Sequence, residues 1–206
     1  MTLLQVNKDV YPPVFSESGR PEQKEPADSR VVTLGSGALS QATASQLNLL
    51  LPNVTIKPDS GLMSSRDMET SILGADLVLD GSGNDNDRYL INRTCLKMGV
   101  PWVYAAIRDG YGLLMVIIPK VTPCFECLMG QPGDSFFQPH PPTLAAGILP
   151  MVASLQVSQA YHLLMGDSHW LRGLIYVDAW TSHYETIEIK GRKGICPACG
   201  FGGQKY

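Results

Sequence analysis

The stretch Val31-Val32-Thr33-Leu34-Gly35-Ser36-Gly37-Ala38-Leu39-Ser40 determines how the ordered part of this chain begins. Its first four residues predict a short buried strand, and its two glycines predict a tight turn. In the helix that follows, Leu39, Ala42, Leu47 and Leu50 recur at helical spacing. Val54-Thr55-Ile56 predicts a second strand that ends near Asp59. This order of elements is the unit of a parallel, doubly wound α/β sheet.

The turn between the first strand and the helix carries part of a phosphate-binding motif. Gly35 and Gly37 are the first two glycines of a G-x-G-x-x-G pattern, and Ser40 occupies the third position. Gly35 permits the tight turn, while Gly37 and the helix start let a phosphate approach backbone N–H groups. Asp59 stands where an acidic residue accepts ribose hydroxyls. Two interpretations stay open: a nucleotide site, or a turn that only packs a helix on a sheet.

The rest of the chain continues the alternation of strands and helices and then changes character. Strands are expected at Asp76–Asp80, Trp102–Ala106, Leu113–Ile118, Leu174–Asp178 and Tyr184–Ile189, and helices at Ser65–Leu73, Asp87–Met98 and about Leu149–Met165. The strand at Leu113–Ile118 follows a glycine turn and is expected to pair antiparallel. The fold class is therefore a Rossmann-like mixed sheet with a C-terminal antiparallel extension.

Four of the five cysteines form two Cys-x-x-Cys pairs, Cys124/Cys127 and Cys196/Cys199. Two such pairs can complete a tetrahedral, all-thiolate zinc site. The other interpretation is a set of redox dithiols or disulfides. A redox pair usually opens a helix of a thioredoxin-like unit, whereas the first pair here follows an apolar strand and the second lies near the C-terminus. The spacing therefore favours a structural zinc ion.

The composition bounds the class of protein. The chain has 206 residues, 44% hydrophobic and 17% charged, with a formal net charge of -3 and no long basic run. Nucleic acid and membranes are therefore poor candidate partners. The first residues lack the pattern of a signal peptide, and a zinc-thiolate site favours a reducing compartment, so we expect a cytoplasmic protein. Residues 1–29, rich in proline and polar residues after Phe15, predict a flexible N-terminal arm, and residues 30–206 a single domain.

Several segments together resemble the E1-like activating enzymes, the ThiF/MoeB/HesA group. They are Asp76-Leu77-Val78-Leu79-Asp80, Arg88-Tyr89-Leu90-Ile91-Asn92, Val100-Pro101-Trp102-Val103-Tyr104-Ala105-Ala106, Thr122-Pro123-Cys124-Phe125-Glu126-Cys127-Leu128, Ala146-Gly147-Ile148-Leu149-Pro150 and Cys196-Pro197-Ala198-Cys199-Gly200. The resemblance implies ATP and Mg²⁺ as cofactors. It also implies adenylation of the carboxy-terminal carboxylate of a ubiquitin-like protein or peptide, in a homodimer. It places Gly35, Gly37, Asp59, Asp80, Asn84 and Arg88 at the nucleotide.

This chain departs from the family pattern at three places. Gly83 occupies the position before Asn84 where the family has an acidic magnesium ligand. Only about sixteen residues separate Asp59 from Asp76, and Arg66 is the sole cation among them. No cysteine precedes the Ala-Gly-Ile-Leu segment. The fifth cysteine, Cys95, lies on the apolar stripe of a predicted helix and is expected to be inert core.

Asp80 and Arg88, near the turn after the strand Asp76–Asp80, each allow two roles. Asp80 ends a buried strand, where capping the turn is expected rather than catalysis. Arg88 can meet a phosphate or a substrate carboxylate, or it can pair with Asp80 or Asp85. Two functions follow. The first is a zinc protein that binds a nucleotide, the carboxy-terminal tail of a small protein or peptide, or both. The second is a non-catalytic recognition subunit of a peptide- or cofactor-modifying complex.

Overall fold

The computed structural model describes residues 29–51, 55–59, 64–108, 110–130, 145–167, 169–189 and 196–200. Residues 1–28 of the predicted arm and the segment that precedes the Ala-Gly-Ile-Leu stretch lie outside these ranges. The strands are β1 (Arg30–Leu34), β2 (Thr55–Asp59), β3 (Leu77–Asp80), β4 (Trp102–Arg108), β5 (Tyr111–Ile117), β6 (Leu174–Asp178) and β7 (His183–Ile187). The helices are α1 (Ala38–Leu50), α2 (Ser65–Ile72), α3 (Asp85–Met98), α4 (Phe125–Met129) and α5 (Ala145–Leu164).

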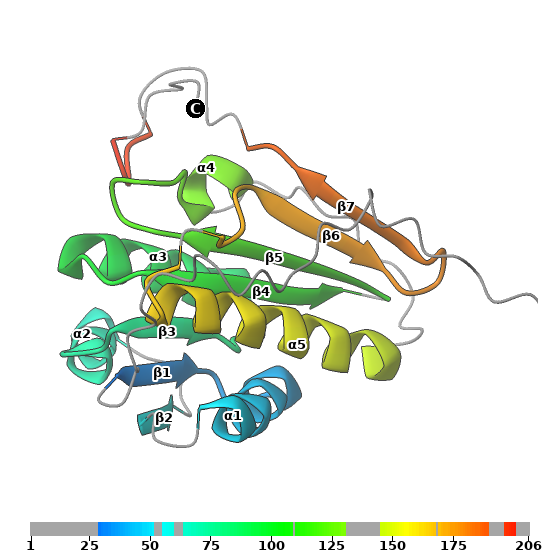
Figure 1. Ribbon diagram of the computed structural model, residues 1–206. Helices are drawn as coiled ribbons and strands as arrows, with labels where there is room; N and C mark the ends of the chain where they lie inside the picture. The colour runs from blue at the N-terminus through cyan, green and yellow to red at the C-terminus, as the bar shows by residue number, and fades with distance from the viewer. Residues whose placement is uncertain are drawn as a thin grey trace, which may run out of the picture.

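All seven described strands form one mixed sheet in the order β2-β1-β3-β4-β5-β6-β7 (Figure 1). Strands β2, β1, β3 and β4 are parallel to one another, whereas β5, β6 and β7 each pair antiparallel with the preceding strand. The predicted Rossmann-like sheet with an antiparallel extension is therefore confirmed. The carboxyl ends of β1, β2 and β3 lie side by side, since Leu34 pairs with Asp59 on one side and with Asp80 on the other.

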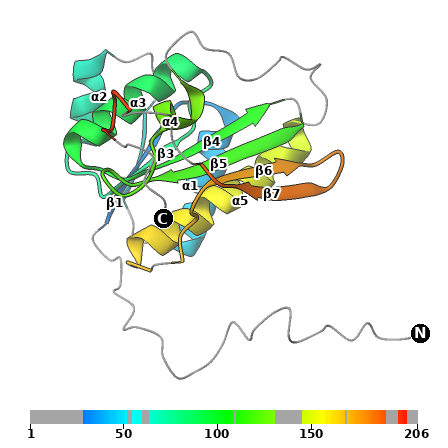
Figure 2. The ribbon, with the colours of Figure 1, turned by 90° about the horizontal axis from the view of Figure 1, so that it is seen from above.

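Helices cover both faces of the parallel strands. Figure 2 shows α2, α3 and α4 on one side of the sheet and α1 and α5 on the other. The first side contains the largest buried rings, with Phe125 6.1 Å from Trp102 and 5.1 Å from Tyr104 between ring centroids. On the second side α5 approaches β5 closely, because a Cβ on Gly112 would lie 2.2 Å from Val152 Cγ2. A glycine is therefore required at this contact.

Helix α1 differs from its predicted pattern at one position. Leu39 and Leu47 are buried as expected, but Leu50 is 48% exposed. Thr43 and Leu51 are buried on this side of the sheet instead, and Leu47 accepts the cap hydrogen bond from Leu51 N–H. Leu50 is exposed because the helix ends there and the chain turns inward one residue later.

Helix α5 begins earlier than expected, and helix α4 was not expected. α5 begins at Ala145 and contains Pro150, whereas the sequence predicted a start at about Leu149. The first turn of α5 is stabilised by Ile148, which is fully buried beside β5. α4 was not predicted because five residues are too few to show a helical period. None of the described helices is long and apolar enough to cross a membrane.

Candidate functional site

The turn between β1 and α1 exposes the start of a helix at the carboxyl edge of the sheet. Gly35 adopts φ +111°, and a Cβ there would lie 2.3 Å from the Gly81 carbonyl oxygen. Gly37 is the exposed N-cap of α1, with extended backbone and no side-chain hydrogen bond to the helix. The first turn of α1 contains no acidic residue. Its N–H groups therefore have the geometry and dipole direction that suit an anion.

Ser40, in the third position of the glycine pattern, is accommodated by Gly81, which directly follows strand β3. A Cβ on Gly81 would lie 2.4 Å from Ser40 Cβ and 2.8 Å from Ser40 Cα. In dinucleotide-binding proteins the third glycine permits close packing of helix and strand. Here Gly81 provides that space from the β3 side. The sequence did not reveal that Gly81 takes over the role of the third glycine, because residues 40 and 81 are far apart in the chain.

Substituting Gly81 tests this packing. We expect Gly81→Ala to lower the free energy of unfolding by about 3 kcal/mol, because the new methyl group overlaps Ser40. The double variant Ser40→Gly/Gly81→Ala should recover part of this loss, since the hydroxymethyl group is then gone and only the backbone of residue 40 stays close. Gly83→Ala is the matched control: no atom lies within 4 Å of its Cβ position, so its effect should stay within about 0.5 kcal/mol. Urea denaturation measures all three, and an equal loss in Gly81→Ala and the double variant would contradict the steric explanation.

Asp80 and Arg88 form a buried ion pair behind this turn. Arg88 Nε donates to Asp80 Oδ2 at 2.8 Å, and side-chain exposure is 5% for Arg88 and 0% for Asp80. Arg88 also donates to Asp85 Oδ1 at 2.8 Å and to the carbonyl oxygens of Ser82 and Ala105. Burial alone would lower the pKa of the Arg88 guanidinium, but the Asp80 carboxylate raises it, so the arginine stays charged. The structure thus shows the predicted pairing of Arg88 with Asp80 and Asp85, and its contact with a phosphate or carboxylate stays a prediction.

The remaining oxygen of Asp80 is also engaged. Asp80 Oδ1 accepts hydrogen bonds from Ser82 N–H at 2.8 Å and from Ser82 Oγ at 2.6 Å. This is the turn-capping geometry expected for Asp80. Asn84 caps α3, accepting from Asp87 N–H at 2.9 Å. The side chain of Asp59 lies outside the described atoms, although its backbone ends β2 at the same edge.

Asp85 links the buried pair to an arginine nearer the surface. Its carboxylate lies 2.8 Å from Arg88 Nη1 and 2.7 Å from Arg108 Nη2. Burial alone would raise the pKa of Asp85, but the two arginines lower it overall. The cluster of Asp80, Asp85, Arg88 and Arg108 therefore contains two negative and two positive charges that compensate one another.

The turn after β3 offers few oxygen atoms that could bind Mg²⁺. Gly83 offers no side chain, and both Asp80 oxygens already accept protein hydrogen bonds. Mg²⁺ normally requires one or two available carboxylates together with phosphate oxygens. Within the described ranges, the cysteines form the only group of three or more potential ligand side chains close enough to hold an ion. At the turn after β3, Gly83 thus supplies no carboxylate at the position where the family resemblance implied a magnesium ligand.

The four paired cysteines do come together. Their Sγ atoms lie within 4.8 Å of one another. Neighbouring sulfurs are 3.9 Å (Cys124 to Cys127), 3.8 Å (Cys124 to Cys196) and 3.6 Å (Cys127 to Cys199) apart. Tetrahedral Zn–S bonds of about 2.3 Å imply sulfur separations of about 3.8 Å. The cluster can therefore hold a metal ion, and its donor set and spacing fit zinc.

Polar side chains that the sequence did not single out attach α3 to this cysteine cluster. Asn92 Nδ2 lies 3.6 Å from Cys124 Sγ, and Asn92 Oδ1 accepts from Phe125 N–H at 3.1 Å. Glu126, only 1% exposed, pairs with Arg93 Nε at 2.8 Å. Such outer partners orient metal ligands. Cys95 lies apart from the cluster, fully buried, and burial raises the pKa of its thiol, as expected for inert core.

Gln156 is a second unpredicted residue that positions the site. It is fully buried on α5. Its Nε2 donates to the Asp80 carbonyl at 2.9 Å and to the Val103 carbonyl at 3.0 Å, and its Oε1 accepts from Thr43 at 2.8 Å. One side chain thus connects α5, α1, β3 and β4. A polar residue within the apolar stripe of α5 is the only sequence signal of this role.

Comparison with known proteins places these features in a family. A model of the ThiF family matches residues 38–198. The chain is 30% identical over 167 residues to the SAMP-activating enzyme E1 of Haloferax volcanii, a match that covers 80% of this chain and 61% of that protein. It is 30% identical over 138 residues to the sulfur carrier protein ThiS adenylyltransferase of Bacillus subtilis, covering 63% and 38% respectively. The chain therefore spans about three fifths or less of these two relatives.

Solved structures show the same fold at low sequence identity. The structure of E. coli MccB has a TM-score of 0.68 at 13% identity and covers 88% of this chain and 68% of that one. E. coli MccB with ATP has a TM-score of 0.66 at 15% identity, covering 86% and 68%. These similarities concern the arrangement of strands and helices, which agrees with the mixed sheet described above.

Proposed function

The chain belongs to the ThiF family, and from this membership we propose that it binds an adenine nucleotide at the β1–α1 turn and the carboxy-terminal tail of a small protein or peptide beside it. The observation that carries the proposal is the exposed, uncapped start of α1 beneath Gly37. A phosphate there would meet free backbone N–H groups and the positive end of the helix dipole. Asp59, at the adjoining strand end, would accept the ribose hydroxyls.

The choice of partner rests on the relatives. Two of them are named for activating SAMP and for adenylating the sulfur carrier protein ThiS, and a structure of MccB contains N-formylated MccA. Adenylation of a carboxylate is thus the chemistry to which this chain is related. We propose a carboxylate at the end of a small protein or peptide as its substrate class. A homodimeric, cytoplasmic protein belongs to the same proposal.

A second candidate function is a recognition subunit without catalysis. Two features of the described residues favour it: Gly83 supplies no magnesium ligand, and the charges of Asp80, Asp85, Arg88 and Arg108 compensate one another. Stabilisation of charge on a transferring phosphoryl group needs cations or metal aimed at it. Under this alternative the tail of the partner still binds, but no acyl adenylate forms.

In either function the cysteine cluster would hold a structural Zn²⁺ through Cys124, Cys127, Cys196 and Cys199. All four ligands belong to the protein, so no coordination position remains for substrate. The ion would join the segment after β5 to the C-terminal segment, 72 residues later in the chain. Its contribution would be to stability rather than to chemistry.

Calorimetry with ATP tests the nucleotide site. We expect Gly37→Val to weaken ATP binding at least tenfold, about 1.4 kcal/mol, because a branched side chain covers the phosphate position. The fold should tolerate it, since the nearest atom to a Cβ at Gly37 is 3.6 Å away. Ser45→Val, which adds the same group to an exposed position of α1, is the matched control and should bind normally. Equal binding by both variants would contradict a phosphate site at this turn.

Restoring the missing carboxylate separates the two candidate functions. Gly83→Asp should make ATP binding depend on Mg²⁺, because the position is exposed and has free space around it. ATP–pyrophosphate exchange is then measured for both proteins with a small sulfur carrier protein. Exchange by the unchanged chain supports an enzyme. Tail binding without exchange supports the recognition subunit.

A further inference from the structure

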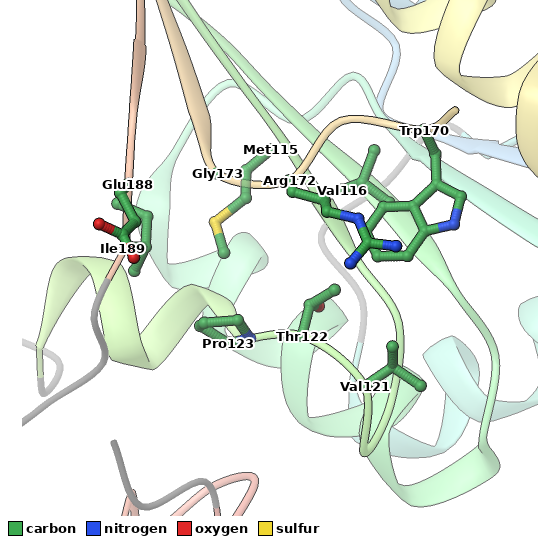
Figure 3. A pocket seen from close by; sticks show the side chains of 10 residues that line it. All are labelled: Met115, Val116, Val121, Thr122, Pro123, Trp170, Arg172, Gly173, Glu188 and Ile189. Carbon is green, nitrogen blue, oxygen red and sulfur yellow. The ribbon is translucent and has the colours of Figure 1, made fainter. Parts of the chain in front are cut away.

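An apolar cavity lies at the opposite edge of the sheet from the nucleotide turn. It lies where β5 ends and β6 begins, and it has a volume of about 180 Å³. Figure 3 shows Trp170 and Arg172 on one wall, Glu188 and Ile189 on the other, and Met115 between them. Pro123, directly before Cys124, forms part of its floor. Neither the nucleotide nor the metal site uses this cavity.

The size and lining of the cavity indicate its occupant. An apolar cavity of about 150 Å³ accepts a benzene molecule, so this one has room for one aromatic ring. The Arg172 guanidinium lies 5.0 Å from the centre of the Trp170 ring, which leaves a flat, partly cationic wall. Trp170 is the aromatic residue of this lining, and grooves that present aromatic side chains bind extended, proline-containing segments. The best fit is therefore an aromatic side chain within such a segment, flanked by acidic residues.

The chain itself contains a segment of this description. The stretch Val10-Tyr11-Pro12-Pro13-Val14-Phe15 combines two aromatic residues with two prolines. Asp9 precedes it and Glu17 follows it, opposite in charge to Arg172, while Lys8 is opposite in charge to Glu188. We propose that residues Val10–Phe15 bind across this cavity in extended form and that the ring of Phe15 enters it.

The start of β1 and the cavity lie at the same edge of the sheet. Arg30, the first residue of β1, donates its N–H to Asp76 at 2.7 Å. Asp76 borders a shallow hollow that also touches Ile118 and ends at Trp170, which it shares with the cavity. The segment therefore leaves the fold at the edge where the cavity opens.

The connecting residues are long enough. From β1 to β5 the sheet crosses three strand spacings, roughly 14 Å. Residues 16–29, with Pro21 and Pro26, separate Phe15 from β1 and span roughly 20 Å as a flexible coil. Phe15 of the same chain can thus reach the cavity without unfolding any described element.

Tryptophan quenching tests the proposal in the full chain. In a Trp180→Phe background the exposed indole is removed, and Trp102 is fully buried, so acrylamide reports mainly on Trp170. We expect Phe15→Ala to raise the quenching constant severalfold, with a smaller rise for Glu17→Lys. Gln23→Ala, in the connecting residues, is the control and should leave it unchanged. Folding is monitored by circular dichroism.

A second experiment uses a synthetic peptide that covers residues 8–17. Added to the Phe15→Ala variant it should restore protection of Trp170 in a saturable manner, whereas a peptide of the same composition in scrambled order should not. Unchanged quenching in Phe15→Ala overturns the proposal. A rise in Tyr11→Ala but not in Phe15→Ala overturns the choice of ring. If the protection of Trp170 in the protein with the intact segment disappears when the protein is diluted, the segment binds another chain, and the proposal of binding within one chain is overturned.

Discussion

Cys196→Ser is expected to lose its bound zinc and to lower the free energy of unfolding by more than about 4 kcal/mol. The expectation rests on the close approach of the Sγ atoms of Cys124, Cys127, Cys196 and Cys199. The ion would cross-link two segments that lie far apart in the chain. Its binding energy is available only to the folded chain, which has the ligands assembled. Metal analysis of the purified protein, together with urea denaturation with and without a chelator, measures both effects.

The control for this prediction is the fifth cysteine. Cys95 is fully buried but lies outside the cluster, so Cys95→Ala should retain about one zinc per chain and lose only the packing of one sulfur atom. A metal-free protein that is as stable as the zinc-loaded one would contradict the structural role. So would a Cys196→Ser variant that keeps its metal and its unfolding midpoint.

Arg88→Met is expected to lower the free energy of unfolding by about 3–5 kcal/mol, because it leaves the carboxylate of Asp80 buried without its partner. Counted over the whole residue, Asp80 is 1% exposed and Arg88 4% exposed. Water therefore cannot reach the Asp80 carboxylate to replace the lost guanidinium group. The substitution keeps an unbranched apolar side chain at this position and removes the guanidinium group. Urea denaturation at neutral pH measures the change.

Two further variants separate the buried charge from other effects of the substitution. Asp80→Asn/Arg88→Met should be more stable than Arg88→Met, because the uncompensated charge is gone. Lys97→Met breaks an ion pair with Glu69 whose side chains are 66% and 40% exposed, and should change stability by no more than about 1 kcal/mol. If Arg88→Met keeps its stability but loses ATP binding, the arginine serves the nucleotide rather than Asp80.

The sequence predicted those parts of the fold that depend on local patterns. Apolar runs such as Leu77–Leu79 are recognisable as buried strands because both faces of a parallel sheet are covered. The cysteine cluster was predictable from spacing, since a Cys-x-x-Cys pair brings two thiols to one point. The start of α1 was predictable from its two glycines. In each case the decisive pattern is local, and the association of the two Cys-x-x-Cys pairs follows from the four thiolates that a structural zinc ion requires.

What the sequence did not predict depends on interactions between distant residues. Gln156 binds the Asp80 carbonyl 76 residues away, and Asn92 binds Phe125 33 residues away. For Arg88 the sequence allowed two roles, because the choice depends on burial and on where the strand ends lie. The start of α5 was placed too late because its first turn is stabilised by the packing of Ile148 on β5, a contact between residues far apart in the chain.

The close approach of Gly81 and Ser40 also restricts the order in which substitutions at these two positions can occur. A Cβ at position 81 would lie 2.4 Å from Ser40 Cβ, so Gly81→Ala is expected to cost less after Ser40→Gly than before it. The reverse order passes through an intermediate with the steric overlap. Ser40→Gly alone removes one hydroxymethyl group near the start of α1, at roughly 1 kcal/mol or less. The two positions thus form an epistatic pair, in which the effect of Gly81→Ala depends on whether Ser40→Gly is already present.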